Sequence, residues 1–446
     1  MLLVAGVRSS TRTNMARAGT PPPMQAQPAA APPPAGLSED IHAEILARVP
    51  AKSVLRFRSV CRAWRRLTTD PYFLAAHARL RPAEVVLYRY LDSARRENRP
   101  LGYAVDVALD ALPVSGDRAR RRRLVRYPKY YVTGSREPWR YSMPQHCLLL
   151  ASCGGVLLFA TKGADSYLLC NPITRQWAAL PKITDAAAGA AGGIRVSEYA
   201  FYFHEPSGEH RLLCGRREPA GADDAPTAWC ILSTGAALPR RVDTCTQAAD
   251  DLRVPGLRHT DATPVPLHGH LHWPPHRDAL NRETLEMVAF DTAAETFHAM
   301  AGPRVAASAR MKLFAMDGLL VAANFGGEEA RHVDLWFLTC YGTADGRWER
   351  RHRVATPWGF GWGVASLMAT AAASDDRGNV MLGTHHGLSV YNVRTKTVRV
   401  VKDVATRSND VLMSRHVFRE SLVQHPGFRH RQARSYADLP LIHFWR

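Results

Sequence analysis

Three histidines alternate along the short stretch HGHLHW, which ends at Trp273. Side chains two residues apart share one face of a strand, so His268, His270 and His272 could together approach a metal ion. At the usual strand rise the first and third would lie roughly 13 Å apart. No fourth ligand follows at a recognisable spacing, and we expect a sheet strand and no bound metal here. The adjacent residues His385 and His386 would point to opposite faces of a strand, so they do not strengthen the case for a metal site.

Glycine-rich and basic stretches are the other places where chemistry could reside. GFGWG at 359–363 lacks the GxGxxG spacing, the following helix and the lysine of a phosphate-binding loop, so we expect a sheet edge. The run RARRRRLVRYPK, from Arg118 to Lys129, has the composition of a nuclear import signal or an RNA contact. We interpret it as a solvated loop.

Catalytic chemistry has no local signature in this chain. The scattered serines, histidines and aspartates form no nucleophile–base–orienter set. We therefore expect no catalytic residue and no cofactor.

Length and composition indicate more than one domain. The 446 residues exceed the usual size of one compact domain, and 46% hydrophobic residues allow packed cores. The net charge of +18 favours acidic partners such as nucleic acid or an acidic protein surface, although solvated arginines explain it equally well. Eight scattered cysteines without a CxxC pair favour reduced, buried thiols over zinc or disulfide sites.

The sequence predicts no membrane span, either in the N-terminal tail or in the longest apolar run. Residues 1–36 contain seven prolines and no acidic residue, which predicts a disordered tail that faintly resembles a transit peptide. The longest apolar run, Cys147 to Ala160, is shorter than the ~20 residues that a span needs. Gly154-Gly155 interrupts it, which predicts two buried strands joined by a turn.

A helical unit is predicted from Leu37 to about Leu80. Ser38 can cap a first helix, and Glu39 and Asp40 then lie in its first turn, where the helix dipole favours negative charge. Pro50 ends this helix.

Two further helices are predicted in the same unit. Ser53 can cap the second, in which the apolar residues between Phe57 and Leu67 form one stripe and arginines take most other positions. Asp70-Pro71 reads as an N-cap followed by proline at the first helical position, which opens a third helix.

A unit of roughly 45 residues seldom buries enough surface to be stable alone. Val54 and Leu55 add further apolar surface, and no metal or disulfide framework is present. The apolar surface that the helical unit cannot bury within itself is covered either by another protein or by the rest of this chain. Composition does not decide between the two.

The same residues resemble an F-box. That family runs from a Leu-Pro pair through the pattern eIL.rLP.ksL.r.r.VCr.Wr.l..dp.F, and order and spacing hold over about 40 residues. The matching residues are Glu44-Ile45-Leu46, Arg48-Val49-Pro50, Lys52-Ser53-Val54-Leu55, Arg58, Val60-Cys61-Arg62, Trp64-Arg65, Leu67, Asp70-Pro71 and Phe73. One departure is Leu37-Ser38 in place of Leu-Pro, which loses a contact of the proline ring but retains a helix cap.

The resemblance implies a partner. F-boxes bind a Skp-type linker protein, which connects them to a cullin–RING ubiquitin ligase, and the acidic linker suits the arginines of the second helix. By this match, the residues that form the docking surface or directly support it are Leu37, Ile45, Leu46, Val49, Pro50, Val54, Leu55, Val60, Cys61 and Trp64. We expect direct contact for Val49, Pro50 and Leu55, and a supporting role for Trp64 and Phe57.

Residues 84–440 predict an all-β domain. Apolar runs of period two, such as EVVLYRY and LEMVAFD, alternate with Gly, Asp, Asn and Pro. Three hairpins repeat the order strand, Asn or Asp, Thr-bearing turn, strand, with Asn171, Asp291 and Asn392 closing the turns. They lie 120 and 101 residues apart, with weaker copies midway, so one unit has about 50–60 residues. This pitch predicts a β-propeller of six or seven blades, with a sandwich or several small β domains as the alternative.

The β region resembles, more loosely, the kelch-like F-box-associated domain of plant F-box proteins. The resemblance rests on NPITRQWAALP at 171–181, GHLHW at 269–273 and ESLV at 420–423. The kelch double-glycine signature is not repeated. In that family the domain captures the protein to be ubiquitinated, and its loops carry recognition.

The resulting prediction is an α+β multidomain protein: a three-helix F-box followed by a propeller. It would act as the non-catalytic substrate-recognition adaptor of a Skp–cullin–F-box ubiquitin ligase, located in the cytoplasm, the nucleus or both. A first alternative is a basic nuclear RNA-binding or scaffold propeller, with RNA at Arg121–Arg123 and the helices packed in cis. A second is a propeller hydrolase with a metal at His268 and His270. We expect nucleic-acid binding to be absent and the target to be an unknown protein.

Overall fold

The computed structural model describes residues 37–90, 103–117, 120–131, 147–161, 166–183, 195–217, 228–242, 254, 256–257, 263–275, 286–305, 311–325, 331–342, 346–356, 370–373, 377–384, 387–401, 411–425, 427–430 and 443–444. Three predicted features lie outside these residues: the tail 1–36, GFGWG at 359–363, and His385-His386. The chain divides into two units, residues 1–42 and 43–446.

Four short helices follow one another: α1 (Glu39–Arg48), α2 (Ala51–Phe57), α3 (Arg62–Thr69) and α4 (Pro71–Arg79). The Ser38 hydroxyl accepts a hydrogen bond from the Ile41 amide at 3.4 Å, which confirms the predicted cap of the first helix. Asp70 accepts from the amides of Tyr72 and Phe73 at 2.9 and 3.1 Å, which confirms the predicted start of the last. Of the described helices, none has the length and apolar character that crossing a membrane requires.

The predicted second helix is two helices, α2 and α3. At Cys61 the backbone is extended, with φ −153° and ψ 166°, and the Cys61 sulfur accepts a hydrogen bond from the Trp64 amide at 3.4 Å. A cysteine thus caps α3. The predicted cap at Ser53 is wrong, because α2 begins two residues earlier, at Ala51. There the Ala51 amide donates a hydrogen bond to the Glu420 carboxylate at 3.0 Å.

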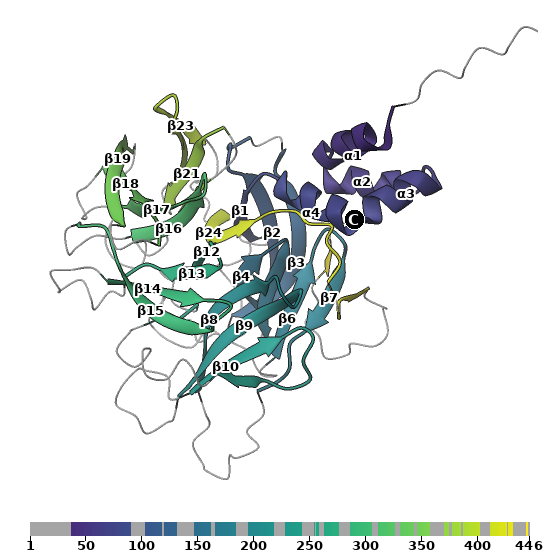
Figure 1. Cartoon of the computed structure of the whole chain (residues 1–446), viewed down its shortest axis with the longest axis horizontal. Helices are drawn as coiled ribbons and strands as arrows, with labels where there is room; N and C mark the ends of the chain where they lie inside the picture. The colour runs from purple at the N-terminus through teal and green to yellow at the C-terminus, as the bar shows by residue number, and fades with distance from the viewer. Residues whose placement is uncertain are drawn as a thin grey trace, which may run out of the picture. The chain divides into compact units, whose positions relative to one another are not determined.

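The β region is a six-bladed propeller, which confirms the predicted fold class (Figure 1). Each blade is an antiparallel sheet. Blade 1 has the order β24 (Val411–Phe418), β1 (Glu84–Tyr90), β2 (Tyr103–Pro113), β3 (Arg122–Tyr131), β26 (His443–Phe444). Blade 2 has the order β4 (Cys147–Cys153), β5 (Val156–Thr161), β6 (Ser166–Asn171), β7 (Gln176–Ala179), β25 (Arg429–His430).

The remaining four blades have four strands each in the described residues. Blade 3 has β8 (Arg195–His204), β9 (Glu209–Arg217), β10 (Ala228–Ser233) and β11 (Arg240–Val242). Blade 4 has β12 (Val265–Leu267), β13 (His270–Trp273), β14 (Glu286–Asp291) and β15 (Thr296–Ala301). Blade 5 has β16 (Met311–Met316), β17 (Leu319–Asn324), β18 (His332–Thr339) and β19 (Arg347–Ala355), and blade 6 has β20 (Thr370–Ala373), β21 (Asn379–Thr384), β22 (Gly387–Asn392) and β23 (Thr397–Val401).

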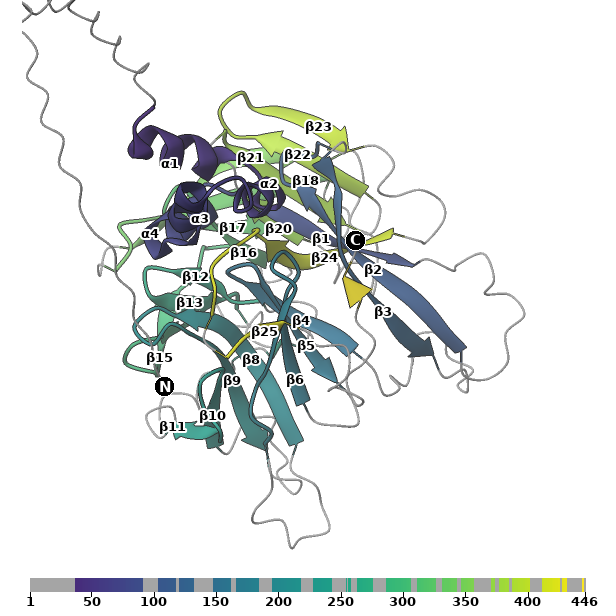
Figure 2. The ribbon, with the colours of Figure 1, turned by 90° about the vertical axis from the view of Figure 1, so that its right-hand side faces the viewer.

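The last long strand closes the ring. β24 pairs with β1, from Glu84 opposite Phe418 to Arg89 opposite Val411, so chain segments more than 300 residues apart share blade 1. β24 also contacts β4 of blade 2 and β20 of blade 6. Figure 2 shows β24 beside β1. Among the described strands, the C-terminal β24 thus completes the blade that the N-terminal strand β1 begins.

The repeated hairpins lie at equivalent places in blades 2, 4 and 6. The side-chain oxygens of Asn171, Asp291 and Asn392 each accept from the backbone amides two and three residues further on, at 2.7–3.2 Å. The weaker copies form the hairpins β10–β11 and β18–β19 in blades 3 and 5. Halving the observed spacing therefore gave the correct blade length.

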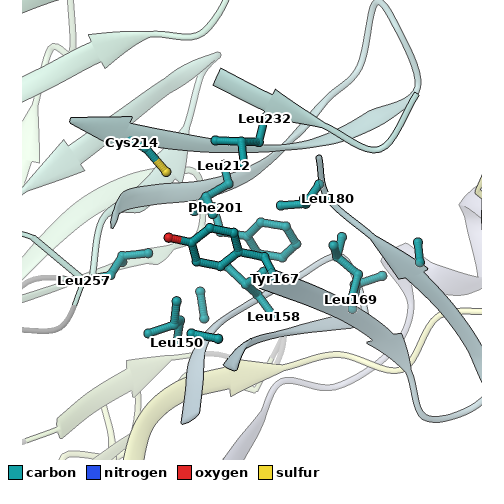
Figure 3. Close-up of a cluster of buried hydrophobic side chains, with 14 of the residues drawn as sticks. Leu150, Leu158, Tyr167, Leu169, Leu180, Phe201, Leu212, Cys214, Leu232 and Leu257 are labelled. Carbon is teal, nitrogen blue, oxygen red and sulfur yellow. The ribbon is translucent and has the colours of Figure 1, made fainter. Parts of the chain in front are cut away.

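Side chains on both faces of the blades are buried. Figure 3 shows the cluster between blades 2 and 3, where Tyr167 and Phe201 lie among leucines from both sheets. The Tyr167 hydroxyl donates to the Glu198 carboxylate at 2.7 Å in this core. Six described cysteines are free; the buried ones follow expectation, whereas Cys61 and Cys340 are exposed.

Candidate functional site

Exposed apolar side chains concentrate in the helices. Of nine exposed large hydrophobic residues among those the structure describes, six lie between residues 37 and 80: Leu37, Ile41, Ile45, Val60, Tyr72 and Leu80. Single exposed apolar side chains are common, but such a concentration in one short segment is typical of a protein-binding surface.

The ten predicted docking residues separate into three groups. Exposed ones are Leu37, Ile45, Pro50, Val60 and Cys61; half-buried ones are Val49, Leu55 and Trp64; buried ones are Leu46 and Val54. Val60 is 62% exposed, whereas Val54 is fully buried. A partner could contact the first two groups directly, and the buried pair could only support them.

The buried pair belongs to a core that the helices share with the C-terminal segment. Leu46 and Val54 pack with Phe73 and Leu74 of α4, and with Leu422 beyond β24. Trp64 is partly buried at this core, with its ring edge-to-face against Phe57 at 5.4 Å. Part of the apolar surface is thus covered in cis, as the alternative prediction required, while Ile45 and Val60 stay exposed.

We call the contact region between the helices and the segment Arg419–Leu422 the junction. Glu420 lies at its polar centre. Besides the Ala51 amide, its carboxylate binds the guanidinium groups of Arg122 at 2.6 Å and Arg81 at 3.4 Å. Arg122 also binds Glu84, and burial raises the pKa of the Glu84 carboxyl in spite of that positive partner. The four charged side chains therefore form one network, in which Arg81, Glu84 and Glu420 are buried and Arg122 is half-buried.

The last turn of α1 is satisfied by the same network. Arg81 donates to the carbonyls of Ala47 and Val49 at 2.7 and 3.0 Å, and His77 contacts the Val49 carbonyl at 2.9 Å. The final carbonyls of a helix have no partner within it, so these side chains act as its C-terminal cap.

Two motifs identified from the sequence contact each other. Asn171 is the first residue of NPITRQWAALP. Its side-chain amide donates a hydrogen bond to the Ser421 carbonyl of ESLV at 3.1 Å. Gly155 lies so close that an added Cβ would be 2.5 Å from the Ser421 Cβ. The ESLV segment therefore connects blade 2, blade 1 and the helices.

The basic run is not the solvated loop that we expected. From Arg122 onward it forms strand β3, and Arg121 binds the buried Asp110 carboxylate at 2.7 Å. Two of the three arginines of the predicted RNA patch thus already bind carboxylates. Sequence reasoning erred because Asp110, Glu84 and Glu420 lie 11, 38 and 298 residues from their arginine partners and meet them only in the folded blade.

The histidine stretch is only partly a strand. His268 lies in the turn before β13, with φ 50°, and its ring contacts the Gly318 carbonyl at 3.0 Å. His272 is buried between the Val265 carbonyl and the Tyr341 hydroxyl, and burial lowers its pKa to about 4. In the described part of the chain, no group of three or more His, Cys, Asp or Glu side chains is placed to hold a metal.

Sequence reasoning missed Glu420 and Arg81. Neither carries a local signature, because they bind each other across 339 residues of sequence, and Glu420 binds Arg122 across 298. The one signal was the ESLV resemblance, which marked the segment without revealing its contacts.

The chain thus combines a short helical segment, which carries exposed apolar side chains, with a six-bladed propeller. Residues 35–75 match the family of F-box domains. The helical segment of this chain is an F-box domain.

Similar proteins are known from Arabidopsis thaliana. The F-box protein At5g49610 is 29% identical over 147 residues, which cover 32% of each chain. An F-box/kelch-repeat protein, At1g15680, is 28% identical over 145 residues, again 32% of each. The chain therefore matches about a third of the length of these relatives. A TolB protein from Agrobacterium tumefaciens has a TM-score of 0.34 and 8% identity over 76% of this chain and 98% of its own, too distant to support an argument.

Proposed function

We propose that this protein is the substrate-recognition adaptor of a Skp–cullin–F-box ubiquitin ligase, acting in the cytoplasm or nucleus. The F-box binds the Skp-type linker, and the propeller, of the kelch-like F-box-associated type, binds the target protein. The observation that carries the proposal is the set of exposed apolar side chains within a segment that matches the F-box family.

The exposed side chains suit a protein interface. F-box domains generally bind Skp1-type subunits of such ligases. Ile45 and Val60 are 50% and 62% exposed, so the fold does not depend on burying them. Burying a large aliphatic side chain contributes about 1.5–3 kcal/mol, so a few of them suffice for specific binding.

The chain itself contributes proximity. Other subunits transfer ubiquitin, and holding the target near them accelerates the reaction without a catalytic residue here. The junction at Glu420 and Leu422 supports this role, because it connects the helices to blades 1 and 2 through buried contacts.

Copurification of the full chain with a Skp-type linker tests the proposal. We expect the unchanged protein to bind, and Val60→Asp or Ile45→Asp to abolish binding, because a carboxylate would be desolvated at the interface. Leu238→Asp is the matched control, since Leu238 is 70% exposed on the propeller. The ligase proposal would fail if the unchanged protein did not bind the linker. It would also fail if Leu238→Asp weakened linker binding as much as the F-box variants do.

A further inference from the structure

A large basic cleft lies beside the junction. Its volume is about 1630 Å³, and it is lined by residues of the helices, of blades 1, 2 and 6 and of the Arg419–Glu420 segment. Among the described residues that line it, eleven are arginine and one is lysine, against two carboxylates, Glu84 and Glu420. Both carboxylates already bind arginine, so the cleft has a strong excess of positive charge.

Of the four cations that the helices contribute to the cleft, Arg48 pairs with Glu44, and the other three are available for a ligand. Lys52 and Arg56 lie on α2, and Arg79 lies in the last turn of α4. All three side chains are exposed. None of these three side chains has a hydrogen bond or ion pair with another residue that the structure describes.

The propeller supplies the other side. The run Arg120–Arg123 at the start of β3 lines the cleft, together with Arg175 in the β6–β7 turn and Arg377 before β21. Asp110 and Glu84 hold Arg121 and Arg122 in place. Pre-positioned guanidinium groups lose little entropy when they bind an anion.

The lining residues indicate the chemistry of the ligand. Guanidinium groups bind carboxylates and phosphates through paired hydrogen bonds, and arginine clusters are typical of sites for acidic or phosphorylated segments. No aromatic side chain is present among the described lining residues, so the stacking that holds single-stranded nucleic acid is missing. The volume exceeds the roughly 300–1,000 Å³ of small-molecule sites, which favours a peptide.

We propose that this cleft binds an acidic peptide segment, with clustered Asp and Glu or phosphorylated side chains, of a protein other than the linker. Of the ten predicted linker-docking residues, Pro50 and Leu55 line the cleft, whereas the exposed Ile45 and Val60 do not. Identifying that protein as the captured target rests on the proposed function; the preference for an acidic segment does not.

Fluorescence anisotropy with the full chain, in about 0.15 M salt, tests the proposal. The probes are a labelled peptide of alternating Glu and Ser, its phosphoserine form, and a neutral form with Gln in place of Glu. The cleft variant is Lys52→Glu, Arg56→Glu and Arg79→Glu together. The control variant is Arg62→Glu, Lys182→Glu and Arg304→Glu, which changes the net charge equally at exposed residues outside the cleft.

We expect both acidic peptides to bind and the neutral one not to. The stronger of the two acidic peptides identifies phosphate or carboxylate as the preferred group. The cleft variant should weaken binding at least about tenfold and the control less than about threefold, because charge-assisted hydrogen bonds are local. If the cleft variant unfolds at a lower temperature than the control, the same three residues changed to Gln should give the same loss.

Equal loss in both variants would overturn the proposal, since it would indicate general charge attraction. So would tighter binding of oligouridine or of inorganic tripolyphosphate than of the acidic peptides. A saturating amount of linker should leave peptide binding unchanged; displacement would assign the cleft to the linker instead. If the linker does not bind the chain at all, the ligase proposal fails while the peptide result stands.

Discussion

Glu420 connects parts of the molecule that are far apart in sequence. It accepts from the first amide of α2 and binds Arg81 and Arg122, and it is only 7% exposed. Removing one member of a buried charge network leaves the others desolvated and unpaired, which costs more than the network contributes when intact.

Glu420→Ala should therefore lower the free energy of unfolding by about 3–5 kcal/mol, measured by urea denaturation. The control is Glu349→Ala, which breaks a half-exposed pair with Arg351 at 3.3 Å. It should cost less than about 1 kcal/mol, because exposed pairs are screened by solvent. Similar losses in the two variants would mean that the junction does not depend on Glu420.

His210 should make the fold sensitive to acid. It is fully buried, with its ring 4.4 Å from that of His425, and burial together with that neighbour lowers its pKa to about 3. The unfolded chain binds this proton below about pH 6.5, and the native protein does not until about pH 3. Stability from this residue is complete above about pH 6.5 and falls by about 1.4 kcal/mol per pH unit toward pH 3.

His210→Phe should remove that contribution. Between pH 7 and pH 5 the unfolding free energy of the variant should fall less steeply than that of the unchanged protein, since one proton fewer is taken up on unfolding. Parallel pH profiles would contradict the assignment.

At the scale of elements, the inner turns of the blades require left-handed backbone. Gly154-Gly155, His268-Gly269 and Asp317-Gly318 have positive φ at both residues, the geometry that matches the twist of a two-residue hairpin. Their surroundings differ. An added Cβ at Gly155 would meet Ser421 and the Arg419 carbonyl, whereas at Gly318 no atom lies within 4 Å.

Gly318→Ala should cost about 1–2 kcal/mol of unfolding free energy, the strain of the left-handed conformation alone. Gly155→Ala should cost about 3 kcal/mol or more, because overpacking against the ESLV segment adds to the same strain. Thermal unfolding of both variants measures the difference. Equal losses of unfolding free energy in the two variants would show that the ESLV segment can move away from the added Cβ of Gly155→Ala without cost.

Elements specified by local patterns could be predicted from the sequence, and elements specified by distant partners could not. The strands and the Asn171, Asp291 and Asn392 turns are encoded within a few residues each. The start of α2 depends on Glu420, and the course of the basic run depends on Asp110 and Glu84. For the same reason the sequence identified the F-box segment but could not separate buried Val54 from exposed Val60.

At the scale of the whole molecule, one C-terminal segment both closes the ring and supports the helices. β24 pairs with β1, and Leu422 then enters the helical core. The F-box helices thus depend on Glu420 and Leu422, which are synthesised more than 300 residues after them.

Removing residues 402–446 should therefore prevent folding of the propeller and of α2, because the ring loses its closure and the helices lose Glu420 and Leu422. Circular dichroism and size-exclusion chromatography would detect an unfolded or aggregated chain. Removing residues 431–446, of which the structure describes only the two-residue strand β26, should leave a folded protein. A folded product of the longer truncation would contradict the closure that we describe.

Hydrogen exchange on the full chain, measured with and without a Skp-type linker, shows directly whether the helices form the linker-binding surface. We predict slower exchange at the amides around Ile45 and around Val60, the exposed residues outside the basic cleft, when the linker is added, and unchanged exchange in blades 3 to 5. Unchanged exchange in the helices at a saturating linker concentration, or protection confined to the blades, would contradict this prediction.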